Sequence, residues 1–370
     1  MPEQEPFYKL KILFLESFFG GSHKDFALGL KEHSRHEIDL LTLPDKNWKW
    51  RMRGAALEFT SRVENIEKYD LIFATDMINL ADFKACNDIK DIPVVLYFHE
   101  NQLTYPLAPG QKQDWQFGIT NITSALCATK ILFNSRFQLD EFIIKTEEFC
   151  SNVPDFKPQW IKKKILKKSK VLYPGCRFSK SKINLNNPDI KPPLIVWNHR
   201  WEWDKNPDVF FQVLSTLKEK KIPFKLALLG ENSGNIPKKF RAAEQKFKDE
   251  LISFGYVESK DEYIQLLKRG AVVVSTSIQE NFGISVVEAV RMGCIPLLPD
   301  RLSYPEIMPD QHLKKILYSD TKDLLQKFEH MLLNYTEYMG LREDLSHSMG
   351  KYSWENMVEQ YDNIFDGQLP

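Results

Sequence analysis

Short apolar runs alternate with helical patterns along most of the chain. In the first half, strands are expected at residues 11–15, 38–43, 71–75, 93–98, 130–134 and 171–173. A helix is expected at 135–148, where apolar residues recur at helical spacing and Ser135 stands in a good capping position. Buried strands that alternate with helices predict a parallel sheet covered on both faces.

The alternation stops at residues 179–193, which are polar and contain three prolines and three asparagines. It then resumes with expected strands at 194–197, 224–229, 251–256, 271–275 and 295–298, and expected helices at 207–217, 237–248, 261–269, 285–292 and from 321 onward. The predicted class is α/β, with two doubly wound Rossmann-like domains facing a cleft. The expected parts are a first domain (1–180), a linker (181–193), a second domain (194–350) and a C-terminal helix (351–370) that packs back on the first domain.

Composition narrows the class of protein. Fifty basic side chains balance fifty acidic ones, so any nucleic-acid or membrane surface must be a local patch. No apolar run approaches the roughly 18 residues of a membrane helix, and the N-terminus lacks the basic start and apolar core of a signal peptide. The five cysteines are scattered without metal-ligand spacing, which indicates reduced thiols and a cytoplasmic protein.

Residues 279–289 follow an expected strand and open an expected helix. Glu280 lies just before this helix, and Glu288 lies one to two turns into it. Backbone N–H groups of Phe282 and Gly283 at the helix N-terminus form a natural anion site, and two carboxylates suit a hydroxyl-rich ligand. The alternative is a capping acid followed by an ordinary surface acid.

A second polar cluster follows the first strand of the second half. Arg200 and Lys205 lie in its loop and could neutralise a diphosphate, arginine as a fork and lysine as a point charge. The alternative pairs them with Glu202 and Asp204 in a solvated loop.

Polar side chains also follow the strands of the first half. A Gly20-Gly21 turn and His23 come after the first strand, and Asp76 after the third. The other candidates are Trp48, Trp50 and Arg51, then His99, Glu100, Asn101 and Gln102, and then Asn134 and Arg136. Glycines allow close approach of a ligand, and aromatics interleaved with cations suit a base or sugar. The alternatives are a tight strand-to-helix turn, core tryptophans and structural histidines.

Residues 161–170 hold six lysines and no acid. On a chain of zero net charge this is a sharp local field that suits RNA phosphates, although such a run is also typical of a solvated helix face. Trp48, Trp50 and Trp115 are available to stack a splayed base.

Arg200-x4-Lys205 followed by Glu280-x7-Glu288 resembles the second half of retaining GT-B glycosyltransferases, notably family 4. The resemblance implies that the basic pair holds the diphosphate of a nucleotide-sugar. It also implies that Glu280 contacts the donor sugar and that Glu288 contacts the ribose. Residues Asn281, Phe282 and Gly283 would support sugar and phosphate, and Tyr256 and Val257 would lie along the base.

More specific motifs occur at 16–24, 48–51, 99–102, 133–135, 197–202 and 304–307. Together they resemble the tRNA-queuosine mannosyltransferase family, whose members move mannose from GDP-mannose to queuosine at the wobble position of aspartate tRNA. The resemblance implies a retaining enzyme whose partners are the anticodon loop of that tRNA and a nucleotide-sugar, with no membrane partner, no cofactor and no metal. No Asp-x-Asp motif occurs in the chain, which agrees with a metal-free donor site.

The implied residues divide by role. The catalytic set is His99, Arg200, Lys205 and Glu280; the donor set is Gly20, Gly21, Tyr256, Val257, Asn281, Phe282, Gly283 and Glu288; the acceptor set is His23, Trp48, Trp50, Arg51, Glu100, Asn101, Gln102, Asn134 and Arg136. The main alternative is a GT-B enzyme with another nucleotide-sugar donor, or with a lipid, glycan or small-metabolite acceptor. A binding module without activity, and a phosphorylase or epimerase of the same architecture, are further alternatives. The oligomeric state stays open.

Overall fold

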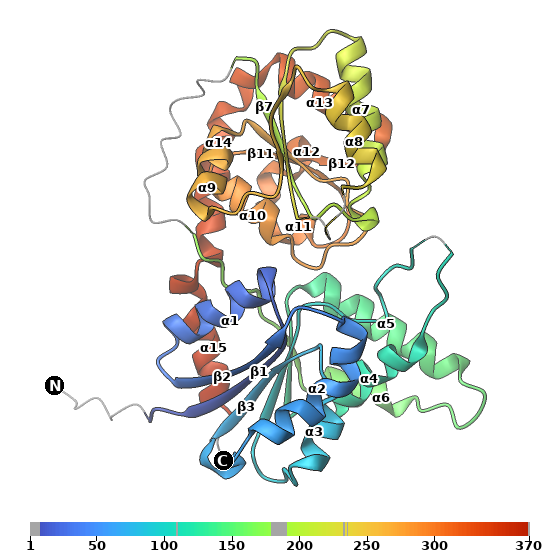
Figure 1. The fold of residues 1–370 in the computed structure, drawn as a ribbon, viewed down its shortest axis with the longest axis vertical. Helices are drawn as coiled ribbons and strands as arrows, with labels where there is room; N and C mark the ends of the chain where they lie inside the picture. The colour runs from blue at the N-terminus through green and yellow to red at the C-terminus, as the bar shows by residue number, and fades with distance from the viewer. Residues whose placement is uncertain (1–7, 109, 179–190, 232–233, 235, 369–370) are drawn as a thin grey trace, which may run out of the picture. The chain divides into compact units, whose positions relative to one another are not determined.

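The computed structural model describes residues 8–108, 110–178, 191–231, 234 and 236–368. The chain forms two compact units (Figure 1). Unit 1 is Met1–Arg177 together with Tyr352–Pro370, and unit 2 is Phe178–Lys351. The last helix of the chain therefore belongs to the first unit.

Unit 1 is built on six parallel strands in the order β2-β1-β3-β4-β5-β6. They are β1 (Lys11–Phe19), β2 (Glu37–Pro44), β3 (Leu71–Thr75), β4 (Val94–Phe98), β5 (Lys130–Phe133) and β6 (Ser169–Val171). The strand order reverses direction between β1 and β3. In an open parallel sheet this switch point, at the carboxyl ends of the strands, is where ligands bind.

Both faces of this sheet are covered. Successive residues of β1 point to opposite faces, so Ile12 and Phe14 lie in one core while Leu13 and Leu15 lie in the other. On the first face pack α1 (Gly21–His33) and α15 (Trp354–Asp366). On the second pack α2 (Trp48–Arg62), α3 (Leu80–Cys86), α4 (Trp115–Cys127), α5 (Arg136–Asn152) and α6 (Trp160–Leu166), with the short η1 (Ile66–Lys68) leading into β3.

The buried indole of Trp354 attaches α15 to unit 1 through two glycines. A Cβ at Gly29 of α1 would lie 1.8 Å from Trp354 Nε1, and one at Gly175 would lie 2.2 Å from the same ring. A backbone bridge joins Cys176 and Ser353 beside it. The sequence around Gly29 indicates only a helix. The need for glycine at this position follows from the packing of Trp354 against it.

Replacing Gly29 with alanine is therefore expected to destabilise unit 1 by about 2–3 kcal/mol, because the indole must move in a filled core. The matched control is Gly340→Ala in α14 (Met339–Met349), where an added Cβ meets nothing within 4 Å. Removing that glycine from a helix is expected to leave stability equal or higher by up to about 1 kcal/mol. Chemical unfolding of both variants checks the pair, and equal effects would contradict this account of Trp354.

Unit 2 repeats the architecture with strand order β12-β11-β10-β7-β8-β9, again all parallel. Its strands are β7 (Leu194–Asn198), β8 (Lys225–Leu229), β9 (Leu251–Gly255), β10 (Val272–Val274), β11 (Ile295–Pro299) and β12 (Leu317–Tyr318). Its main helices are α7 (Pro207–Glu219), α8 (Lys238–Lys246), α9 (Lys260–Arg269), α10 (Ile284–Arg291), α11 (Tyr304–Ile307), α12 (Leu313–Ile316), α13 (Thr321–Leu333) and α14. The strand order reverses between β7 and β10, which places the expected ligand edge there.

The structure confirms the predicted α/β class with two doubly wound sheets. Ser135 caps α5 through its side chain, as expected. β6 begins two residues earlier than predicted, and α2, α3, α4 and α6 lie between strands, where helical patterns were expected without assigned bounds. Residues 181–190 of the predicted linker lie outside the described residues. Among the described helices, none is both long and apolar enough to cross a membrane.

Candidate functional site

The switch point of unit 2 brings the predicted basic and acidic residues together. Lys205 ends η2 (Trp203–Lys205), the turn after β7, and Glu280 lies in the loop after β10. The Lys205 Nζ donates to the Gln279 carbonyl at 2.9 Å and lies 3.4 Å from Glu280 Oε2 and 3.1 Å from Asp204 Oδ2. Residues 75 positions apart in the sequence thus form one ionic cluster.

This cluster is held in a dry environment. Lys205 is 7% exposed and Asp204 is 1% exposed. Burial alone would favour the neutral amine, but the carboxylates of Glu280 and Asp204 outweigh it and raise the pKa of Lys205. The ammonium is therefore a fixed cation at neutral pH. The Thr276 hydroxyl donates to the carbonyls of Lys205 and Asn206 and holds the turn in place.

Arg200 differs from Lys205 in its surroundings. Its side chain is half exposed, and its guanidinium lies 3.4 Å from Glu202. The predicted basic pair is thus one buried cation and one surface cation, both in the loop that follows β7. Arg200 pairs with Glu202 at the surface, as the alternative interpretation expected. Lys205 pairs with Asp204, but this pair is buried and not solvated.

The loop before α10 ends at a glycine that forms the N-terminus of that helix. Gly283 is the N-cap of α10 and has φ +94°, a conformation that favours glycine. Asn281 and Phe282 are buried beside it, and the Ser303 hydroxyl donates to the Phe282 carbonyl at 3.1 Å. No acid occupies the first turn of α10, so its positive end is not neutralised from within the helix.

Glu288 lies farther along α10 and has partners that the motif did not indicate. Its carboxylate accepts from Lys260 Nζ at 2.6 Å and from the Tyr263 hydroxyl at 3.2 Å. Tyr263 in turn accepts from Asn198 at the end of β7. The predicted ribose-binding carboxylate is therefore oriented by α9 and β7. Tyr256 and Val257 follow β9, and the ring of Tyr256 is exposed.

The switch point of unit 1 gathers a second cluster of ionisable groups. His23 Nδ1 lies 3.4 Å from Glu16 Oε2, and the rings of His23 and His99 have centroids 4.2 Å apart. Asp76 at the end of β3 accepts the backbone N–H of His99 at 2.8 Å. Glu16 lies within β1, whereas His23, Asp76 and His99 follow β1, β3 and β4, as the sequence predicted.

The two histidines carry opposite charge preferences. Burial favours neutral imidazole, yet ion pairing with Glu16, together with the fields of Asp76 and Glu100, raises the pKa of His23 to about 9. Burial, and then the neighbouring His23, lower the pKa of His99 well below its ordinary value. Burial raises the pKa of Asp76 to about 8 against the opposing field of His23. At neutral pH the cluster holds a cationic His23 beside a neutral His99.

Glu16, His23 and His99 are also the described group whose arrangement comes nearest to a metal site, with ligand atoms within 4.8 Å of one another. A metal would need a neutral His23. Ion pairing with Glu16 keeps His23 protonated at neutral pH, so a metal bound here would have to displace that proton.

The other predicted acceptor residues have mixed surroundings. Asn134 donates to the His99 carbonyl at 2.8 Å and so holds that loop. Asn101 is buried, and its side chain accepts from the N–H groups of Leu103 and Thr104, which gives it a turn-forming role. Gln102 donates to Glu100 at 3.2 Å. Arg136 is exposed at the first position of α5.

The tryptophans of α2 divide between core and surface. Trp48 packs with Met52, Met77 and Phe117, whereas Trp50 is 62% exposed. The indole of Trp50 lies along Gly54, where a Cβ would come within 2.6 Å of it. Arg51 donates to the Pro44 carbonyl. Trp50 therefore exposes a flat ring to solvent, as stacking requires. Trp48 packs against apolar side chains, as the alternative interpretation expected.

The two glycines before α1 differ. Gly20 is extended, and a Cβ there would overlap the Asp45 carboxylate, while Gly21 has φ +46° and open space around it. Phe18, just before them, contacts both the ring of His23 and the Trp48 cluster. The turn therefore leaves backbone accessible at Gly21.

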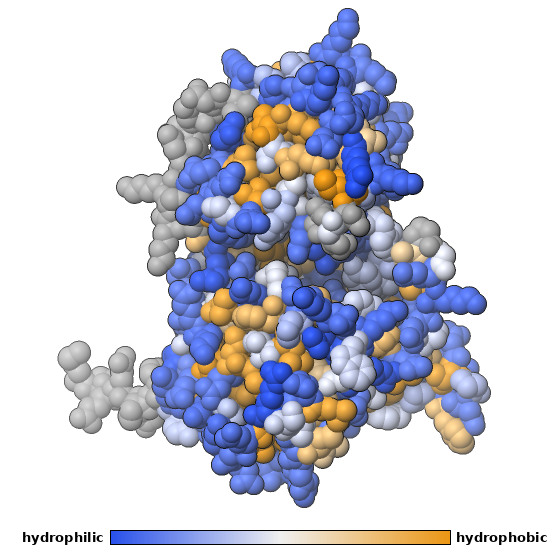
Figure 2. Space-filling view, in the orientation of Figure 1, coloured by the Kyte–Doolittle hydropathy of each residue, from blue (hydrophilic) through white to orange (hydrophobic). Residues whose placement is uncertain are grey.

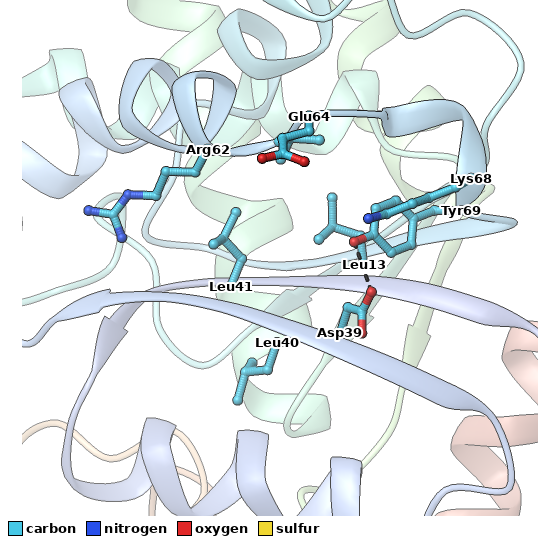
Figure 3. A pocket seen from close by; sticks show the side chains of 9 residues that line it. Leu13, Asp39, Leu40, Leu41, Arg62, Glu64, Lys68 and Tyr69 are labelled. Carbon is cyan, nitrogen blue, oxygen red and sulfur yellow. Dashed lines mark hydrogen bonds between the residues drawn. The ribbon is translucent and has the colours of Figure 1, made fainter.

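A small hollow in unit 1 lies away from these residues. It measures about 170 Å³ and is lined by Leu13, Asp39, Leu40, Leu41, Arg62, Val63, Glu64, Lys68 and Tyr69. Figure 3 shows the Tyr69 hydroxyl bonded to Asp39 across it, at 2.9 Å. None of the predicted site residues lines this hollow, so it is not the candidate site.

Comparison with known proteins follows the two-unit division. Residues 11–176 match the family model described as tRNA-queuosine alpha-mannosyltransferase N-terminal, and residues 179–353 match glycosyl transferases group 1. The tRNA-queuosine alpha-mannosyltransferase of Drosophila melanogaster is 33% identical over 373 residues, which cover 98% of each chain. The chain belongs to the tRNA-queuosine alpha-mannosyltransferase family. It is a glycosyltransferase, as the sequence motifs predicted.

Solved structures share the fold of this mannosyltransferase family member. Sucrose-phosphate synthase from Thermosynechococcus elongatus has a TM-score of 0.73 at 13% identity, covering 97% of this chain and 99% of that one. Anabaena HepE in complex with UDP and glucose has a TM-score of 0.69 at 14% identity, covering 97% of this chain and all of that one. These matches confirm the GT-B fold.

Three residues of the two clusters in this mannosyltransferase family member were not predicted as site residues from the sequence. Asp204 appeared only as a surface partner, Glu16 only as part of a motif, and Tyr263 not at all. The signal for Tyr263 was weak, because a tyrosine in an amphipathic helix is usually core.

The His23–Glu16 pair predicts how stability depends on pH. The folded pKa of about 9 exceeds the unfolded value of 6.5, so this stabilisation is complete below pH 6.5 and is lost as pH rises through 9. The loss is expected to be about 3 kcal/mol. Thermal unfolding of wild type and His23→Gln between pH 6 and 9.5 checks it. Equal slopes in the two proteins would show that His23 is not protonated in the folded state.

Proposed function

We propose that this protein transfers mannose from GDP-mannose to queuosine at the wobble position of aspartate tRNA, with retention of configuration. The observation that supports it most is the family match along nearly the whole chain, combined with the buried Lys205–Glu280 pair at the switch point of unit 2. The coarse activity follows from the family; the donor, the tRNA species and the stereochemistry are the proposal.

The proposed donor site lies in unit 2. Lys205 and Arg200 would bind the diphosphate, and the backbone around Gly283 would bind phosphate or sugar oxygens. As the bond between sugar and phosphate breaks, negative charge grows on the diphosphate. A fixed ammonium in a dry site stabilises that charge without reorganising, which lowers the barrier. Glu280 would orient the sugar and Glu288 the ribose, with Tyr256 and Val257 along the base.

The proposed acceptor site lies in unit 1. The neutral His99 can accept a hydrogen bond from a sugar hydroxyl or donate one to it. The cationic His23 adds positive charge close to His99. The exposed face of Trp50 suits a base splayed from the anticodon loop. The remaining predicted acceptor residues with polar side chains stay as candidates for polar contacts: Arg51, Glu100, Asn101, Gln102, Asn134 and Arg136.

In this scheme the leaving phosphate oxygen takes the proton of the attacking queuosine hydroxyl. The new glycosidic bond forms on the face from which the diphosphate departs, so the configuration is retained. No protein base and no metal is needed, and positioning does the remaining work.

The test uses radiolabelled GDP-mannose with total tRNA and, in parallel, tRNA that lacks queuosine. Label is expected only in the queuosine-containing sample, unchanged by EDTA and removed by ribonuclease. Label that resists ribonuclease would move the acceptor to a glycan, lipid or metabolite. Transfer from UDP-sugars but not from GDP-mannose would overturn the donor assignment.

A further inference from the structure

The loop between α5 and α6, with the outer face of α6, concentrates charge and exposed aromatic rings. Residues 151–170 contain seven lysines and one acid, in a chain of zero net charge. We define the α5–α6 corner as Phe156, Lys157, Trp160, Lys163, Lys164 and Lys167. Each of these side chains is exposed. In Figure 2 the edge of unit 1 where Figure 1 places α6 shows polar and apolar side chains next to one another.

The face of α6 is sorted by helical spacing. Ile161 and Ile165 point into the core, while Trp160, Lys163, Lys164 and Lys167 recur at intervals of three and four on the outer face. The Lys164 Nζ lies 5.6 Å from the Trp160 ring. In the described part of the chain, the ion pair formed by this segment is that of Lys162 with Glu147 at 2.6 Å, and no ion pair involves the three outer lysines. Their charge therefore faces solvent.

Not every lysine of the run is available. Lys168 points inward and donates to the carbonyls of Leu126 and Ala128 at the end of α4. Burial lowers its pKa to about 8. The sequence pattern could not separate this structural lysine from the others, and the structure excludes it from the surface.

Phe156 is a second feature of the α5–α6 corner that indicates a role in binding. Its side chain is 89% exposed, and its backbone has φ +46°, which a bulky residue rarely adopts. The Asp155 carboxylate accepts the Phe156 N–H at 2.8 Å, and prolines at 154 and 158 bracket the loop. An aromatic ring held out by a strained, braced loop contributes nothing to the core, which favours a role in recognition.

The corner is remote from the proposed modified nucleotide. α5 begins at Arg136, next to Asn134 and the His99 loop, and its 17 residues span about 25 Å before the corner begins. A nucleotide bound at His99 does not reach that far. An RNA that contacts both places must extend beyond the anticodon loop.

We propose that the α5–α6 corner is a second RNA-binding surface that holds the body of the tRNA through phosphates and one unpaired base. The lysines match the phosphates and the rings of Phe156 and Trp160 match a base, the combination that RNA-binding surfaces use. This inference rests on the proposed function, since it takes tRNA as the substrate. It adds that affinity for the substrate depends on residues far from the chemistry.

The experiment measures the affinity of the full-length protein for an unmodified aspartate tRNA transcript, by fluorescence anisotropy at several salt concentrations. Lys163→Glu/Lys164→Glu/Lys167→Glu is expected to weaken binding at least tenfold and to lower the salt slope by about 2 to 3. Phe156→Ala/Trp160→Ala is expected to weaken binding about tenfold with the salt slope unchanged. The matched control, Lys238→Glu/Lys246→Glu/Lys248→Glu, removes three exposed lysines at α8 of unit 2 and is expected to bind as wild type does.

The outcomes separate this inference from the proposed function. Variants of the corner that bind tRNA like wild type, in a protein that still mannosylates queuosine, would overturn the inference alone. A wild-type protein that binds GDP-mannose but no tRNA would overturn the proposed function and this inference with it. Loss of binding to phosphatidylserine vesicles with tRNA affinity unchanged would assign the corner to a membrane and overturn it as well.

Discussion

Replacing Lys205 with alanine is expected to lower kcat/KM for mannosyl transfer by about a thousandfold. The ammonium is fixed in a dry site beside Glu280, where a positive charge stabilises a leaving diphosphate far better than it would in water. Steady-state assays with GDP-mannose measure the effect. Activity within a few-fold of wild type would remove Lys205 from the donor site.

The same change carries a stability cost that must be separated from the loss of activity. Among the described residues, the buried Asp204 carboxylate forms an ion pair with Lys205 and with no other cation. Lys205→Ala therefore leaves this buried charge without an ion-pair partner. Removing one partner of a buried pair costs about 3–5 kcal/mol. The double variant Lys205→Ala/Asp204→Asn removes the orphaned charge, so it is expected to regain much of the stability and none of the activity. Recovery of activity in the double variant would show that folding, not chemistry, caused the loss.

Replacing Glu280 with glutamine is expected to lower kcat about a hundredfold, with a smaller loss of stability than Lys205→Ala, because Lys205 keeps Asp204 as its partner. The side chain is 18% exposed and keeps its shape, but the amide loses the charge that accepts from sugar hydroxyls and holds the Lys205 ammonium. The measurement is kcat and KM for the donor, with thermal unfolding alongside.

Glu202→Gln is the matched control for this change. Glu202 lies in the loop after β7 and pairs with the half-exposed Arg200. Because exposed pairs contribute up to about 1 kcal/mol, the control is expected to change kcat less than fivefold. Equal losses in Glu280→Gln and Glu202→Gln would contradict a specific role for Glu280.

Much of the fold could be predicted because the inner strands of both sheets are buried on both faces. Such strands appear as continuous apolar runs, and β3 at Leu71–Thr75 matched its predicted range. The predicted bounds of β6 were shifted because Lys168 and Lys170 make its start polar. The bounds of α2 and α6 could not be assigned because tryptophans and lysines interrupt the usual apolar stripe.

The candidate site divides in the same way. Residues in the loops that follow strands, such as His99, Lys205 and Glu280, could be found because the carboxyl ends of parallel strands share an edge. Asp204 could not be distinguished from a surface acid, since its burial depends on the packing of a turn against the loop after β10. Tyr263 reaches Glu288 from a separate helix, and one sequence carries no sign of that contact.

The most direct test of the central claim is mass spectrometry of nucleosides from tRNA that has been incubated with unlabelled GDP-mannose and the enzyme. The account predicts that queuosine disappears and a hexosylated queuosine appears in its place with wild-type protein, and that queuosine remains with Lys205→Ala. Queuosine that stays intact with active wild-type protein, or a hexose found on another nucleoside, would contradict it.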